Sequence, residues 1–193
     1  MMRIITGKAK GIRLKTLEGD TTRPTAERVK ESVFSMLQFD LDSREVLDLF
    51  SGSGQMGLEA VSRGAAHATL VDQSKDAIRV IQENVIKTKL SDQCTVYQGS
   101  ALDYIRRNQE KKVDIVFLDP PYAANLYTPV LRALWQAQML KPSTILVCES
   151  ESEAIFEGDE ALADIYQVNK TVRYGRTVVT VLQPKQGDEN ESM

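Results

Sequence analysis

The stretch V-D-I-V-F-L-D-P-P-Y, at residues 113–122, decides the fold class of this chain. Its first half is an almost continuous apolar run, which is typical of a parallel strand covered on both faces. Asp119 follows at the carboxyl end of that strand, where open α/β sheets bind their ligands. Because Pro120 and Pro121 fix φ and carry no N–H, we expect the Asp119 carboxylate and the Pro120 carbonyl to be two acceptors held at a set angle.

Two such acceptors beside the flat ring of Tyr122 suit a planar group that bears an NH2, and a nucleobase is such a group. The alternative is an ordinary turn after a strand, because Asp and Pro both favour turns. The rest of the chain favours the first interpretation.

Predicted strands and helices alternate on both sides of this stretch. The predicted strands are 46–50, 68–72, 95–98, 113–119 and 144–149, and the predicted helices are 56–63, 75–89, 102–107 and 127–139. This alternation predicts a parallel sheet with helices on both faces. In the amphipathic helix 75–89, the side chains expected to face the core are Ala77, Ile78, Ile81, Val85 and Ile86.

The two ends of the chain add different elements. Residues 165–172 and 177–182 predict an antiparallel hairpin that turns at Tyr174-Gly175. Residues 3–6 and 11–15 predict a short basic β-hairpin, and Thr25 is expected to cap a following helix. We therefore expect an α/β fold with a mostly parallel seven-stranded sheet, divided into an N-terminal unit at 1–38, a main domain at 39–184 and a disordered acidic tail at 185–193.

Composition limits the class of protein. A chain of 193 residues with 42% hydrophobic and 26% charged residues is typical of one globular domain. It has no apolar run of membrane-spanning length and no signal-peptide core, so we expect it in the cytoplasm. Cys94 and Cys148 are expected to be free buried thiols. With His67 as the single histidine, no zinc or other metal site is predicted.

Charge is distributed unevenly around a net value of −3. Residues 1–15 carry no acid, and their bases are Arg3, Lys8, Lys10, Arg13 and Lys15. This basic patch suits a polyanion, although a solvated edge hairpin has the same composition. Arg23, Arg28 and Lys30 place more positive charge at a helix start, where the helix dipole disfavours it. These three residues either bind a ligand or are ordinary surface charges.

A second motif predicts an adenosine-bearing cofactor. The turn D-L-F-S-G-S-G at residues 48–54 follows the first strand, and Gly52, Gly54 and Gly57 fit the pattern G-x-G-x-x-G. Asp72 ends the next strand and can accept bonds from both ribose hydroxyls. Residues 99–101, Gly-Ser-Ala, end the third strand and are expected to lie beside an adenine.

Two classes of enzyme share these features, namely nicotinamide oxidoreductases and methyltransferases that use S-adenosylmethionine. The carboxylate of Asp48 would repel a pyrophosphate but suits a sulfonium and an ammonium group. A hydride donor also has no use for two acceptors at an amine. Both arguments favour the methyltransferase.

The chain resembles the RsmD family of bacterial 16S ribosomal RNA guanine-N2 methyltransferases. The stretches that carry the resemblance are M-R-I-I-T-G-K-A-K-G-I-R-L at 2–14, T-R-P-T-A-E-R-V-K-E-S-V-F at 22–34, V-L-D-L-F-S-G-S-G-Q-M-G-L-E-A at 46–60, F-L-D-P-P-Y at 117–122 and V-R-Y-G at 172–175. The glycine turn and D-P-P-Y occur in many amino-group methyltransferases, whereas the N-terminal stretches narrow the match. Two departures are visible, since Ser100 stands where an Asp is common and Gln55-Met56 replaces a small or apolar pair.

The resemblance implies a Rossmann-like class I methyltransferase fold, S-adenosylmethionine as cofactor, and a monomer that methylates 16S rRNA, either free or within the small ribosomal subunit. The implied catalytic residues are Asp119, Pro120 and Tyr122, with Phe34 as a second wall for the base. The implied cofactor-binding residues are Asp48, Phe50, Ser51, Gly52, Gly54, Asp72, Ser100, Ala101 and Asp119. The implied RNA contacts are Arg3, Lys8, Lys10, Arg13, Arg23 and Arg28. The alternatives are an N6-adenine or protein-glutamine methyltransferase, and a non-catalytic RNA-binding factor.

Overall fold

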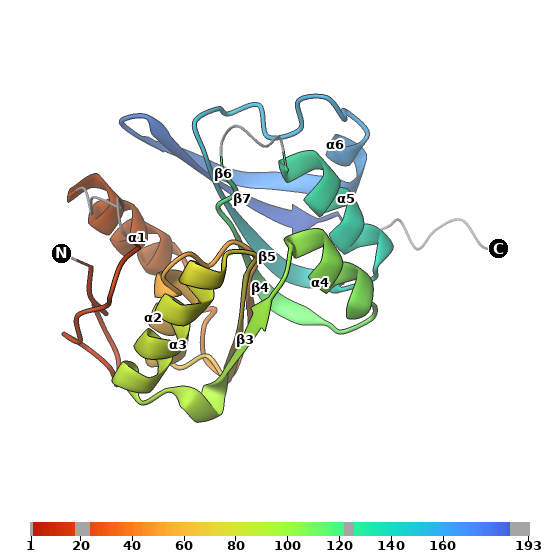
Figure 1. Cartoon of the computed structure of the whole chain (residues 1–193). Helices are drawn as coiled ribbons and strands as arrows, with labels where there is room; N and C mark the ends of the chain where they lie inside the picture. Colours follow the sequence, from red (N-terminus) through yellow and green to blue (C-terminus); the bar gives the residue numbers. More distant parts are fainter. Residues whose placement is uncertain (1, 18–23, 122–125, 186–193) are drawn as a thin grey trace.

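The computed structural model describes residues 2–17, 24–121 and 126–185. In these residues a single sheet has the strand order β3-β2-β1-β4-β5-β7-β6 (Figure 1). Strands β1 to β5 are parallel, and β7 pairs antiparallel with both β5 and β6. The predicted α/β fold with a C-terminal antiparallel pair is therefore confirmed.

The bounds of the sheet strands and of the helices between them agree with the ranges predicted from the sequence to within a few residues. The strands are β1 Glu45–Asp48, β2 His67–Asp72, β3 Cys94–Gln98, β4 Val113–Leu118, β5 Leu140–Ser150, β6 Tyr166–Tyr174 and β7 Thr177–Pro184. The helices are α1 Pro24–Met36, α2 Gln55–Ser62, α3 Lys75–Thr88, α4 Ala101–Arg107, α5 Tyr127–Gln136 and α6 Leu162–Ile165, with a 3₁₀ turn η1 at Ser91–Gln93.

The central strand β4 is covered on both faces, as its continuous apolar run predicts. Ile115 and Phe117 belong to one core cluster, which packs with α1, α2, α3 and the N-terminal segment. Val116 and Leu118 belong to the other, which packs with α4, α5 and α6. Alternating side chains of one strand thus hold both helical layers, and this fixes the site at the strand ends between them.

Three local predictions are wrong. Ile86 is 71% exposed rather than facing the core, because it lies well round the helix from Ile78, Ile81 and Val85. Helix α1 begins at Pro24, so Thr25 lies within it and does not cap it. A proline suits the first turn because the amides there have no partner within the helix.

The third wrong prediction is the pair of N-terminal strands. The segment of residues 2–17, called here the N-terminal arm, folds back on itself with one isolated antiparallel bridge between Arg3 and Arg13. The amides of Ile4 and Leu14 bond across the arm, to Ile12 O at 2.9 Å and Met2 O at 3.0 Å. Those of Ile5 and Thr6 instead donate to the Glu59 carboxylate of α2, at 2.8 and 3.0 Å. The two halves of the arm therefore pair as the predicted hairpin does, but regular strands do not form because α2 takes the donors of Ile5 and Thr6.

Candidate active site

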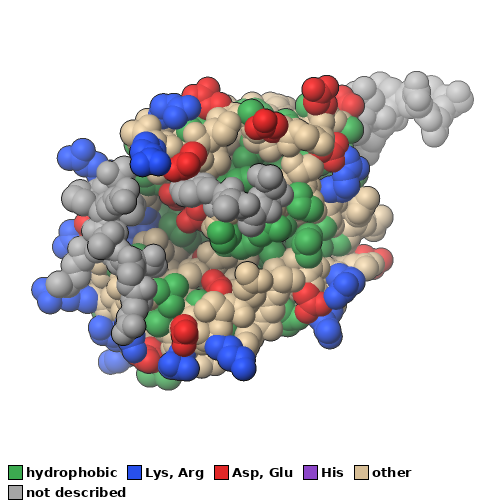
Figure 2. All heavy atoms as spheres, turned by 45° about the horizontal axis from the view of Figure 1, so that its top comes forward, with side chains coloured by type: hydrophobic (Ala, Val, Ile, Leu, Met, Phe, Trp, Pro, Cys, Tyr) green, Lys and Arg blue, Asp and Glu red, His purple; other side chains and the backbone are tan. Residues whose placement is uncertain are grey.

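A cavity of about 430 Å³ opens at the carboxyl ends of β1 to β4, a size typical of small-ligand sites. Figure 2 views the molecule toward this end and shows a hollow there. The predicted site residues that line it are Phe50, Gly52, Asp72, Ser100, Ala101, Asp119 and Pro120. The structure thus brings the glycine turn, the end of β2, the start of α4 and the Asp119 turn together around one space.

Asp72 organises one wall of the cavity. Its Oδ2 accepts the N–H of Gly52 and its Oδ1 accepts the N–H of Ser74, both at 2.9 Å. The carboxylate is half-buried and also lines the cavity. Gly52 has φ +55°, and a Cβ there would meet no atom within 4 Å, so the turn leaves open space where a side chain would otherwise project. The Asp72 carboxylate can still accept hydrogen bonds from the hydroxyls of a ligand in this space.

Three predicted cofactor-binding residues, Asp48, Ser51 and Gly54, do not line the cavity. Asp48 is buried at the start of the glycine turn. Its Oδ2 accepts the N–H of Gly57 at 3.3 Å, and its side chain is 3% exposed. Burial raises the pKa of Asp48 to about 7, although the hydrogen bonds from Gly57, Phe50 and Ser51 oppose the rise. A cation bound above the turn would stabilise the ionised form.

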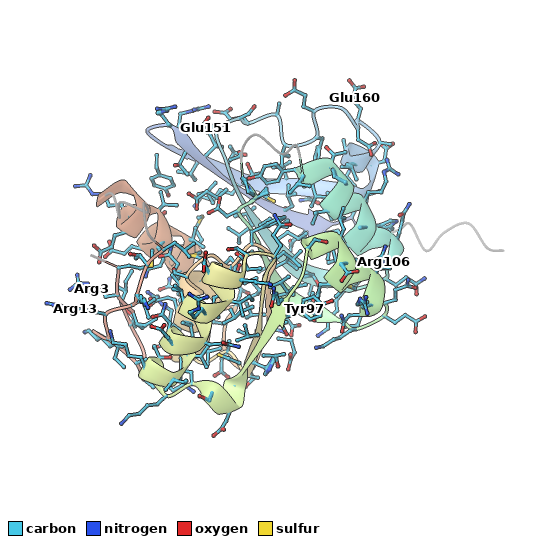
Figure 3. The ribbon with its side chains drawn as sticks, viewed as in Figure 1. Arg3, Arg13, Tyr97, Arg106, Glu151 and Glu160 are labelled. Carbon is cyan, nitrogen blue, oxygen red and sulfur yellow. The ribbon has the colours of Figure 1, made fainter. Side chains whose placement is uncertain are left out.

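The opposite wall begins at Ser100 and Ala101. The Ser100 hydroxyl accepts the N–H of Asp103 at 3.1 Å and so caps α4. Asp103 is held by the Tyr97 hydroxyl at 3.0 Å and by Arg106, and Figure 3 labels Tyr97 and Arg106 on this part of the molecule. The Ser100 hydroxyl can make further hydrogen bonds, because its own hydrogen and a second lone pair are not used by the cap.

Asp119 is exposed, follows the last residue of β4 and lines the cavity together with Pro120. Its predicted position at the strand end is therefore observed. Tyr122, the third member of the predicted catalytic set, lies outside the described residues. The prediction that Phe34 forms a second wall is wrong, because Phe34 is 0% exposed and packs against the Phe117 ring at 5.7 Å between centroids.

Most of the predicted RNA-contact residues lie on the surface. Arg3, Lys8, Lys10, Arg13 and Arg28 are exposed, and Arg23 is outside the described residues. Arg3 pairs with Glu27 at 3.0 Å and Lys8 donates to Gln93. Figure 3 shows Arg3 and Arg13 at the edge of the molecule, and Figure 2 shows Lys and Arg side chains gathered on that side. The sequence suggested a ligand or a solubility role for Lys30 as well, but Lys30 is 3% exposed.

Sequence reasoning missed the residue that attaches the arm to the body, Glu59. It is 0% exposed and accepts hydrogen bonds from the arm amides and from Arg63 Nε at 2.8 Å, with Lys30 Nζ at 3.6 Å. Burial lowers the pKa of Lys30 against the attraction of Glu59. The signal was available, since Glu59 is an acid inside the apolar helix sequence L-E-A-V, where a carboxylate needs buried partners.

Asn84 and Ser62 complete the attachment. Asn84 Oδ1 accepts the N–H of Lys15 at 2.8 Å, and its Nδ2 donates to the carbonyls of Lys15 and of Ser53 in the glycine turn, both at 2.9 Å. Ser62 Oγ donates to Thr6 O at 2.6 Å and accepts from Ala9 N at 3.0 Å. The arm is thus hydrogen-bonded to the helices behind the cavity, and through Asn84 to the cavity loop itself.

The comparisons with known proteins bear on the family of this chain. A family model described as "Conserved hypothetical protein 95" matches residues 2–183. "Ribosomal RNA small subunit methyltransferase D" of Haemophilus influenzae is 36% identical over 154 residues, which is 79% of this chain and 80% of that protein. The chain belongs to the RsmD family. "Putative rRNA methyltransferase YlbH" of Bacillus subtilis is 34% identical over 186 residues, or 95% of this chain and all of that protein.

Solved structures agree on the fold of this RsmD-family protein. "Putative methyltransferase yhhF from Escherichia coli" superposes with a TM-score of 0.82 at 28% identity, over 96% of this chain and 99% of that one. The sheet with its C-terminal antiparallel pair is therefore the class I methyltransferase fold. In residues 2–17, 24–121 and 126–185, no helix is long and apolar enough to cross a membrane. Within those ranges no cluster of His, Cys, Asp or Glu could hold a metal ion, and Cys94 and Cys148 are free thiols.

Proposed function

We propose that this RsmD-family protein transfers a methyl group from S-adenosylmethionine to the exocyclic N2 amine of a guanine in 16S ribosomal RNA. The observation that carries the proposal is the shared cavity, where Asp119 and Pro120 line the same space as Asp72 and Gly52. The names of the relatives from Haemophilus influenzae and Bacillus subtilis support an rRNA methyltransferase.

The residues around the cavity fit S-adenosylmethionine. Asp72 has lone pairs left for ribose hydroxyls beyond the two amides it accepts. Ser100 and Ala101 offer a polar edge and a small buried side chain to an adenine. The proposed set also includes Asp48, Phe50, Ser51, Gly52, Gly54 and Asp119. When bound, the cofactor supplies a methyl group on an electrophilic sulfonium.

Asp119 and Pro120 orient the amine in this proposal. The N2 lone pair is delocalised into the guanine ring, so its reactivity depends on pyramidalisation and aim rather than on a strong base. The carboxylate and the carbonyl accept the two amine hydrogens and favour that shape. Tyr122 stacks on the base, which leaves its own stack to reach the cavity.

The RNA backbone is bound outside the cavity by the basic side chains of Arg3, Lys8, Lys10, Arg13, Arg23 and Arg28. In this arrangement residues 1–38 contribute the RNA contacts and residues 39–184 the chemistry. The protein acts as a cytoplasmic monomer on 16S rRNA, free or within the small subunit.

Replacing Asp119 tests the proposal. We expect Asp119→Ala to lower the single-turnover methylation rate far more than cofactor or RNA affinity, because the contact matters most as the nitrogen pyramidalises. Asp119→Asn keeps one acceptor, and we expect a rate loss of roughly 10- to 1,000-fold. Asp92→Ala, on the exposed η1 turn, is the matched control. Wild-type rates for Asp119→Ala would mean that the turn is only structural.

A further inference from the structure

The stretch V-R-Y-G at residues 172–175 has no role in the function proposed so far. It forms the tip of the β6–β7 hairpin, where Tyr174 pairs with Thr177 and only Gly175 and Arg176 lie between the strands. Gly175 has φ +61°, which suits the first position of a two-residue hairpin turn. The tip is therefore a tight, defined turn.

The hairpin tip is fastened to α1. The Tyr174 hydroxyl hydrogen-bonds to Ser32 Oγ, and the Tyr174 ring packs against the core cluster that contains α1. Ser32 lies four residues after Arg28, so both project from the same face of the helix. Figure 1 shows the hairpin leaning toward α1. The tip thus extends the surface that already carries the proposed RNA contact Arg28.

The register of the sheet places the tip beyond the level of the carboxyl end of β4. Leu118 pairs with Cys148 and Cys148 pairs with Thr180, so Asp119 is level with Val179 across two strand spacings. Gly175 and Arg176 lie three to four residues beyond that level, which is roughly 10–13 Å along the strand direction. Two strand spacings add about 10 Å sideways. The tip therefore projects beyond the strand ends that carry the cavity, two strands to one side of Asp119.

Two arginines at this tip are held by acids from the segment after β5. Arg173 pairs with Glu153 at 3.0 Å and Arg176 with Glu151 at 3.6 Å, and all four side chains are between 48% and 85% exposed. Figure 3 shows Glu151 at this upper edge. Exposed ion pairs of this kind contribute at most about 1 kcal/mol, so a phosphate can displace the carboxylate with little loss.

We propose that the β6–β7 hairpin tip is a second RNA-binding element, in which Arg173 and Arg176 exchange Glu153 and Glu151 for phosphates of the strand that delivers the target base. The inference rests on the proposed function and extends it, because it adds a contact beside α1 to those of the N-terminal arm. Tyr174 acts as a positioning residue that keeps the tip against α1.

The test measures the affinity of the full-length protein for a 16S rRNA transcript as a function of salt concentration. Each phosphate contact contributes about 0.7–0.9 to the slope of log affinity against log salt. We expect Arg176→Glu to flatten the slope by about that amount and to weaken binding severalfold. Lys111→Glu makes the same charge change on the exposed loop before β4, at the amino ends of the parallel strands and so away from the tip, and we expect it to leave the slope unchanged.

The acid partner gives a prediction of opposite sign. Arg173→Ala should weaken RNA binding, whereas Glu153→Gln should tighten it by up to about fivefold, since it frees Arg173 from an exposed ion pair. Cofactor affinity should be unchanged in every variant, which controls for folding.

Equal slopes for Arg176→Glu and Lys111→Glu, together with unchanged affinity for Glu153→Gln, would overturn the hairpin assignment alone. A wild-type protein that binds neither 16S rRNA nor small subunits would overturn the proposed function, and the hairpin assignment with it.

Discussion

The buried carboxylate of Glu59 offers the sharpest test of how the N-terminal arm is held. In Glu59→Gln, the side chain keeps its shape but loses its charge and one acceptor. Both oxygens of Glu59 face donors, since Oε1 accepts from Thr6 N and Arg63 Nε and Oε2 accepts from Ile5 N. Either orientation of the amide therefore directs an NH2 at another donor.

The expected loss follows from this arrangement. Removing one partner of a buried ion pair typically costs about 3–5 kcal/mol, because the remaining charge is left without compensation. Here the charges left behind are Arg63 and Lys30, and Lys30 is 3% exposed and also donates to Arg3 O at 2.6 Å. For a chain of this length, such a loss corresponds to a fall in Tm of roughly 6–20 °C.

The assay is urea unfolding at pH 7 for Glu59→Gln beside Glu83→Gln. Glu83 also joins the arm to a helix, through Lys15 at 2.8 Å, but it is 48% exposed, so we expect its change to cost less than about 1 kcal/mol. Below the unfolding transition, Glu59→Gln should lose RNA affinity through its displaced arm. If both variants unfold at the same urea concentration, the buried attachment does not stabilise the arm and this reasoning fails.

Three further predictions concern the cavity and the glycine turn and helix beside it. Asp72→Ala should weaken S-adenosylmethionine binding by about 1–3 kcal/mol in calorimetry, and binding of NAD in place of S-adenosylmethionine would contradict the assignment. Asp48 has a pKa of about 7 in the folded protein against an ordinary value of 3.8, so between these pH values the folded state retains a proton that the unfolded chain has released. The free energy of unfolding should therefore fall by on the order of 4 kcal/mol as pH rises from about 4 to 7. Asp48→Asn should remove this pH dependence in unfolding curves, and an unchanged dependence would show that Asp48 is not its source. Gly57→Ala should destabilise the protein by about 1–3 kcal/mol in thermal unfolding, because its Cβ would lie 2.2 Å from Leu70 Cδ2, and a wild-type Tm would mean that the helix shifts freely.

The sheet could be predicted because each of its strands has a local signature. The continuous apolar run of β4 indicated burial on both faces, and the two clusters on its alternating side chains confirm it. Residues such as Asp72 and Asp119 could be placed for a related reason, since the carboxyl ends of parallel strands meet at one edge whatever the helices do.

The N-terminal arm could not be predicted in the same way. Its amides bond to Glu59 and Ser62, which lie more than 50 positions away in the chain, and local propensity contains no information on such partners. Lys30 was misjudged for the same reason, because its burial depends on Glu59 from another helix. A free basic hairpin and an arm that is hydrogen-bonded to α2 have the same local sequence pattern, so the pattern does not distinguish them.

The most direct test of the central claim is chemical. Unmodified 16S rRNA, free and within small subunits, is incubated with the purified protein and S-adenosylmethionine, and the nucleosides are mapped by mass spectrometry. We predict one N2-methylguanosine, formed by the wild-type protein and by Asp92→Ala and almost absent with Asp119→Ala. Methylation at adenine N6 or on a protein, or no methyl transfer to either substrate by a protein that binds the cofactor, would contradict the account.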